Sequence, residues 1–83
     1  MNEKEFKQKF ADVLSVCNMT TLHPLDMQRI YDFLHENLNS HRDHDLMHEV
    51  LRVNYPDLGK VGQGKEWFSG FADCILIQKK IMP

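Results

Sequence analysis

The chain has few of the features that mark secreted or membrane-spanning proteins. It contains only two cysteines, Cys17 and Cys74, whereas small disulfide-stapled domains usually carry more. Its longest apolar run is the four-residue stretch 74–77, far short of the roughly 20 residues that a membrane-spanning helix needs. The charged N-terminus lacks the apolar stretch of a secretory signal. We therefore expect a cytoplasmic protein whose two thiols are unreactive and face its core.

A strong charge of one sign is also missing. Ten basic and twelve acidic residues give a net charge of -2 at pH 7 over 83 residues, which excludes a generally cationic nucleic-acid coat protein. With 42% hydrophobic and 27% charged residues the chain has a globular composition, because disordered chains have fewer apolar residues and a larger net charge. No repeat, low-complexity tract or linker divides it, so residues 1–83 are expected to form a single helical domain.

Apolar residues recur at helical spacing along most of the chain. Phe6, Phe10 and Leu14, for example, follow one another every four residues, which places them on one face of a helix. Comparable stripes recur in three later segments. The sequence therefore predicts an all-α fold, a compact bundle of about four short helices at 2–17, 24–38, 41–54 and 65–80, with a glycine-rich loop at 57–64 before the last helix.

Three of these helices begin with residues that favour a helix N-terminus. Asn2 followed by Glu5, and Ser40 followed by Asp43, match the pattern in which a polar side chain caps the first turn. Pro24 suits a first helical position, because the N–H that proline lacks would have no partner there.

The last segment is apolar on most of its surface. Its run 74–77 could also form a short buried strand, but helical periodicity begins seven residues earlier, at Trp67, and favours a helix. A helix that is apolar nearly all round is either central in its bundle or covered by a partner chain. A homodimer formed through this C-terminal helix is therefore one expected assembly.

The glycine-rich loop invites a phosphate-binding interpretation. Residues 59–66 nearly match the motif G-x-x-x-x-G-K-[ST], but Glu66 replaces the hydroxyl residue and no buried strand precedes the loop. Gly59 and Gly62 also match the G-x-x-G element of KH domains, whose strands are missing here. We expect a plain connection. The alternative is a nucleic-acid-binding protein that contacts the phosphate backbone through this loop and the C-terminal lysines, with contacts from Lys60, Lys65, Lys79 and Lys80.

Histidines are concentrated at the start of the third helix. His44 and His48 are one helical turn apart and could converge on a metal ion, but no further ligand stands at a matching spacing, so we predict no metal and no cofactor. We expect instead that these side chains lie on a solvated polar face. A contact surface that responds to pH is the alternative, because clustered imidazoles gain charge between about pH 7 and 5.

Catalysis and DNA reading are not favoured. An enzyme needs a nucleophile, a base and an orienting carboxylate in one water-excluding pocket, and the expected burial of the thiols and exposure of the histidines separates them. We therefore predict that the chain is not an enzyme. Segment 41–54 carries two arginines and three carboxylates, a net charge of -1, which is unsuited to a recognition helix in DNA.

The remaining interpretation is a protein-binding module. Its large apolar residues exceed what four short helices need, and its methionines and tyrosines are side chains that make adaptable contacts. Small acidic bundles are typical of inhibitors and regulators such as antitoxins, immunity proteins and phage-borne regulators, a comparison of class that rests on no shared motif. We expect the chain to bind a larger, basic protein partner, through Asp43, His44, Asp45, His48, Glu49 and Tyr55.

Overall fold

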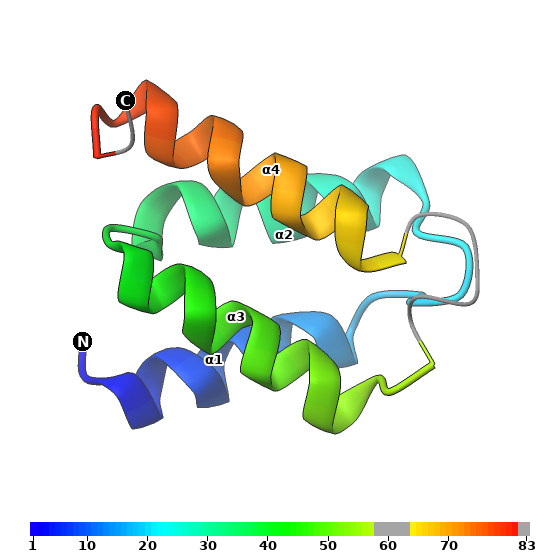
Figure 1. Ribbon diagram of the computed structural model, residues 1–83. Helices are drawn as coiled ribbons and strands as arrows, with labels where there is room; N and C mark the ends of the chain where they lie inside the picture. The colour runs from blue at the N-terminus through cyan, green and yellow to red at the C-terminus, as the bar shows by residue number, and fades with distance from the viewer. Residues whose placement is uncertain (58–63, 82–83) are drawn as a thin grey trace.

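Four helices make up the part of the chain that the structure describes. This computed structural model describes residues 1–57 and 64–81, and the side chains of all of these except 64–66. The helices are α1 (Glu3–Ser15), α2 (Pro24–Asn37), α3 (His41–Asn54) and α4 (Gly64–Gln78), and no strand occurs in these ranges (Figure 1). The prediction of an all-α bundle is confirmed. Each helix end lies within two residues of its predicted position.

The ambiguity over the last segment is resolved in favour of a helix, since 74–77 lies inside α4. The predicted loop at 57–64 falls mostly outside the described residues. None of the described helices is both long and apolar enough to cross a membrane.

Each helix packs against two others around a shared core. α1 contacts α2 and α3, and α4 contacts the same two helices from the opposite side. In the view of Figure 1, α1 and α3 run in one direction while α2 and α4 run back. The same view shows α2 and α4 together on one side of the bundle and α1 and α3 together on the other.

The helix N-termini form as the capping residues predict. The side-chain Oδ1 of Asn2 accepts a hydrogen bond from the backbone N–H of Glu5 at 2.8 Å, and Oγ of Ser40 accepts one from the backbone N–H of Asp43 at 3.1 Å. Pro24 is the first residue of α2. Each side-chain cap stabilises its helix by about 1 kcal/mol, because it satisfies an N–H that has no partner within the helix.

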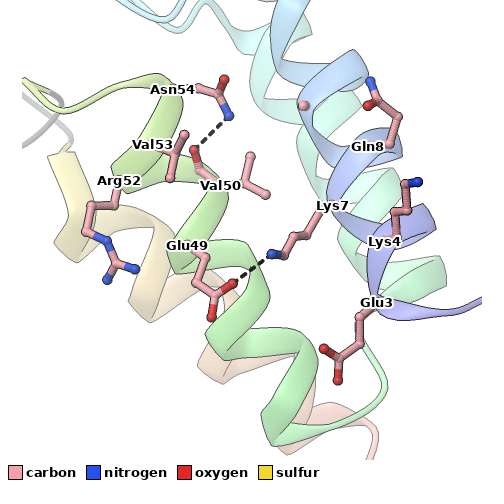
Figure 2. Close-up of a pocket in the computed structure, with 10 residues that line it drawn as sticks. Glu3, Lys4, Lys7, Gln8, Glu49, Val50, Arg52, Val53 and Asn54 are labelled. Atoms are coloured by element: carbon pink, nitrogen blue, oxygen red, sulfur yellow. Dashed lines mark hydrogen bonds and ion pairs between the residues drawn. The ribbon is translucent and has the colours of Figure 1, made fainter.

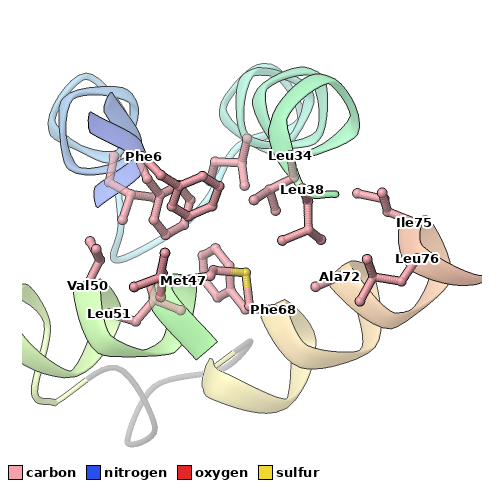
Figure 3. Close-up of a cluster of buried hydrophobic side chains, with 14 of the residues drawn as sticks. Phe6, Leu34, Leu38, Met47, Val50, Leu51, Phe68, Ala72, Ile75 and Leu76 are labelled. Carbon is pink, nitrogen blue, oxygen red and sulfur yellow. The ribbon is translucent and has the colours of Figure 1, made fainter. Parts of the chain in front are cut away.

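Apolar side chains from all four helices meet in one core (Figure 3). Phe33 of α2 adds an aromatic contact, with its ring centroid 5.6 Å from that of Phe6 and 5.7 Å from that of Phe10. Full burial of one such side chain stabilises the fold by about 1.5–3 kcal/mol, so this core fixes which faces of the helices remain outside. Its buried members are Phe6, Phe10, Leu14, Leu22, Ile30, Leu34, Leu38, Leu46, Met47, Val50, Leu51, Phe68, Ala72, Ile75 and Leu76.

One of the two cysteines differs from the expectation. Cys17 is partly buried, and its thiol donates to the backbone carbonyl of Val13 at 3.3 Å. Cys74 is exposed, so the prediction that both thiols face the core is wrong for this residue. The reason is geometric. Consecutive residues of a helix point about 100° apart, so the apolar run 74–77 winds around α4, and only Ile75 and Leu76 within it are buried.

Candidate protein-binding surface

The two histidines predicted to lie on a solvated face of α3 contact α4 instead. Nε2 of His44 lies 3.1 Å from Oδ1 of Asp73, and the side chain of His44 is only 18% exposed. Nε2 of His48 lies 3.2 Å from Oγ of Ser69, and the His44 and His48 ring centroids are 4.7 Å apart. The predicted solvated histidine face is therefore wrong for both, and in the described part of the chain no group of three such side chains is arranged so that it could hold a metal ion.

Other members of the predicted surface are engaged within the chain as well. Oδ2 of Asp43 accepts a hydrogen bond from the backbone N–H of Asn39 at 2.8 Å. Tyr55 is partly buried against the hydrophobic core. Of the six predicted residues Asp45 is exposed and the other five are partly exposed, and contacts within the chain engage most of them.

Glu49, also in the predicted surface, lies in the groove between α1 and α3 (Figure 2). Its Oε2 is 3.0 Å from Nζ of Lys7 and its Oε1 is 3.7 Å from Nη1 of Arg42. The hydrogen bond from Lys7 lowers the pKa of Glu49 below its usual value, and the one from Arg42 lowers that of Glu3. Lys7, Glu49, Arg42 and Glu3 therefore pair with one another across the α1–α3 contact.

The lysines of the alternative site do not form a described cluster. Nζ of Lys79 donates to the backbone carbonyl of Leu38 and to Oδ1 of Asn39, both at 3.1 Å, so this ammonium stabilises the C-terminal end of α2. Lys80 is exposed. Lys60 and the side chain of Lys65, a residue of α4, lie outside the part of the chain that the structure describes.

A shallow groove runs between α2 and α4, on another side of the bundle. It encloses about 390 Å³ and has a mainly apolar lining, made up of Pro24, Met27, Gln28, Tyr31 and Phe71. The lining residues are brought together because Met27 and Tyr31 are one helical turn apart at the edge of the apolar stripe of α2, where that stripe meets α4.

An aromatic row passes through this groove, with Tyr31 and Phe71 in its lining and His35 and Trp67 beyond it. The ring of Tyr31 stacks on His35 at a centroid distance of 5.5 Å and meets the edge of Phe71 at 5.3 Å. The ring of Phe71 in turn stacks on Trp67 at 4.8 Å. Tyr31, Phe71 and Trp67 are each partly exposed, so they present rigid apolar area to solvent. Such side chains are enriched at the centres of protein interfaces.

The rim of the groove on α2 is polar and acidic. Nε2 of Gln28 donates to Oδ1 of Asp32 at 2.8 Å, which holds both side chains beside the groove. α2 carries three carboxylates and one guanidinium, so its net charge of -2 equals that of the whole chain. The guanidinium of Arg29 pairs with Asp26 at 3.3 Å, which leaves Asp32 and Glu36 as the outer charges of the helix.

The large apolar residues, methionines and tyrosines were expected to make contacts, but the sequence did not place Met27, Tyr31, Trp67 and Phe71 on one surface. The available signal was the i, i+4 pair Met27–Tyr31 at the edge of a stripe.

The fold and this groove define a class, an all-α bundle with an aromatic groove along one side. No known family model matches the chain, and no curated protein or solved structure is significantly similar to it.

Proposed function

We propose that this chain is a protein-binding module that takes an amphipathic helix of a larger partner protein into the groove between α2 and α4. The observation that carries the proposal is a groove of about 390 Å³ lined by the partly exposed rings of Tyr31 and Phe71, which His35 and Trp67 extend into an aromatic row. Apolar side chains at helical spacing on a partner would fill such a groove, the common mode by which helical modules recognise each other.

The charge of α2 supports a particular chemistry for that partner. Because Asp32 is held beside the groove by its hydrogen bond from Gln28 of the lining, a helix with basic residues beside its apolar stripe is favoured over an acidic one. This is the basic partner expected from the sequence. The proposed contact surface is the α2–α4 groove rather than the face of α3, because the residues of that face are largely engaged within the chain.

A module of this size acts on a larger protein by covering part of its surface, so we propose the role of an inhibitor or regulator. The free thiols of Cys17 and Cys74 suit a reducing compartment, and we place this activity in the cytoplasm.

The test is affinity capture from the native host with two matched charge reversals. Asp32→Lys alters the rim of the groove and removes the Gln28–Asp32 hydrogen bond. Asp12→Lys removes the equivalent Gln8–Asp12 hydrogen bond on α1, far from the groove, and is the control. We expect wild type and Asp12→Lys to capture the same protein, identified by mass spectrometry, in equal amounts. Asp32→Lys should capture at least about tenfold less of it.

Binding of the captured protein is then followed through Trp67, the only tryptophan of the chain. Because its ring stacks on Phe71 at one end of the aromatic row, occupation of the groove should change its fluorescence. Equal capture by all three proteins, or an unchanged Trp67 signal on binding, would exclude the groove. Capture of nucleic acid instead, with an affinity that falls steeply between about 50 and 200 mM salt, would favour the lysine alternative.

A further inference from the structure

The middle of α4 is apolar on most of its surface, outside the core as well as inside it. Ile77 is 51% exposed although it is a large apolar side chain, and Cys74 is exposed too. Apolar burial fixes the rotation of a helix about its axis only where an apolar side faces a polar one. From Phe68 to Ile77 the only side chains with oxygen or nitrogen atoms are those of Ser69 and Asp73. The contacts of these two residues can therefore select one rotation of α4.

Ser69 and Asp73 lie one helical turn apart on one flank of α4, and each meets an imidazole of α3. Oγ of Ser69 is 3.2 Å from Nε2 of His48, and Oδ1 of Asp73 is 3.1 Å from Nε2 of His44. Nε2 of His44 is shielded from solvent and forms no hydrogen bond within the described chain, so the carboxylate beside it offsets the cost of its burial. A turn of α4 about its axis would remove both oxygens from the imidazoles.

Phe71 lies on the opposite flank of α4. It stands two residues from both Ser69 and Asp73, and two residues correspond to about 200° around a helix. Its ring accordingly points toward α2, where it meets the ring of Tyr31 at a centroid distance of 5.3 Å. Trp67, one turn earlier, lies on the same flank and stacks on Phe71 at 4.8 Å. A rotation of α4 that breaks its contacts with α3 would also move these rings away from Tyr31.

We infer that His44 and His48 are positioning residues, which set the rotation of α4 and thereby hold Phe71 in the lining of the α2–α4 groove. This inference rests on the proposed function, since it gives both histidines a role in the same groove. Neither imidazole belongs to the groove lining, so both act through Ser69 and Asp73. Without these contacts the chain should still fold around its apolar core, but α4 should populate more than one rotation.

The double variant Ser69→Ala, Asp73→Ala tests this role in the full chain. It removes both oxygens, and alanine favours a helix more than serine or aspartate does, so the helix itself is not weakened. Nuclear Overhauser cross-peaks between the rings of Tyr31 and Phe71 report the groove in the free chain. We expect them to lose at least about half of their wild-type intensity, because two rotations share the population. The helix content measured by circular dichroism should equal that of wild type.

Two further proteins separate the contacts from the stability of α4. Ser69→Thr with Asp73→Asn keeps an oxygen at both positions, so its ring cross-peaks should match those of wild type although threonine and asparagine are poorer helix formers than alanine. Cys74→Ala is the matched control on the same helix, because Cys74 is exposed, and it should leave the ring cross-peaks unchanged.

Binding of the protein that wild type captures is measured separately. The double-alanine variant should bind it at least about fivefold more weakly, because part of the population lacks the groove. Lost ring contacts with unchanged binding would support the positioning role and exclude the groove as the binding surface.

A folded double-alanine variant with wild-type ring cross-peaks would overturn the inference. A variant that does not fold would also overturn it, because the contacts would then hold the whole fold and not the rotation of one helix. Loss of the cross-peaks in Cys74→Ala, or in the variant that keeps both oxygens, would have the same consequence.

Discussion

The buried carboxylate of Asp26 gives the sharpest test of how α2 is held in place. Asp26 is the only buried charged residue among those described, with 6% of its surface exposed. Its Oδ2 accepts a hydrogen bond from the backbone N–H of Asn18 at 3.2 Å, and its Oδ1 accepts one from Nη1 of Arg29 at 3.3 Å. It thereby ties the start of the α1–α2 connection, just after α1, to the first turn of α2.

The cost of Asp26→Ala follows from these contacts. Loss of the hydrogen bond between the Asn18 N–H and a buried carboxylate costs about 1.5–3 kcal/mol. The Arg29 pair adds little, since that side chain is 48% exposed. We expect a loss of about 2–3 kcal/mol and a Tm lowered by roughly 8–24 °C for a domain of this size. Asp26→Asn keeps an acceptor without the charge and should cost about 1 kcal/mol.

Urea unfolding followed by circular dichroism measures these losses. Asp32→Ala is the matched control on the same helix, because its exposed carboxylate accepts a single side-chain hydrogen bond from Gln28, which is worth about 0.5 kcal/mol or less. The free energy of unfolding of Asp32→Ala should lie within about 0.5 kcal/mol of the wild-type value. If that of Asp26→Ala lies equally close, the buried carboxylate of Asp26 does not hold α2 in place.

Three further outcomes are expected. Lys79→Met should destabilise the fold by about 1 kcal/mol in urea unfolding, because its ammonium binds the carbonyl end of α2; a neutral effect would contradict this contact. The pKa of Glu49 is lowered by its hydrogen bond from Lys7, so its contribution is present above the ordinary carboxyl pKa near 4.5 and is lost as the pH falls through the lowered value. The free energy of unfolding of Glu49→Gln should therefore fall less steeply at acid pH than that of wild type. An unchanged slope would refute the coupling between Lys7 and Glu49. Burial raises the pKa of the Cys17 thiol, so iodoacetamide should alkylate exposed Cys74 first, as mass spectrometry can show; faster modification of Cys17 would contradict its burial.

Local features of the fold could be predicted from the sequence because their causes are local. The caps of Asn2 and Ser40 depend on residues three positions away, and the apolar stripes depend on the helical repeat alone. Both were predicted and both are present. Cys74 was predicted to face the core, and this was wrong. The short apolar run 74–77 was assigned to the core as a whole, although successive residues of a helix point in different directions.

The candidate surface could not be predicted in the same way. Periodicity locates the centre of a buried stripe but not its width, and the width depends on where neighbouring helices lie. His44 and Met27 both stand at the edge of a stripe, and the sequence does not say that α4 covers the first and forms a groove with the second. The pairing of α4 with both α2 and α3 is a tertiary outcome of the shared core.

Backbone amide NMR of the labelled chain, titrated with the protein it captures, shows whether the α2–α4 groove is the binding surface. We expect the largest chemical-shift changes at the groove, at Met27, Tyr31 and Phe71, with little change along the exposed side of α3. Changes concentrated instead at Asp45 and its neighbours on α3, with the groove silent, would contradict it.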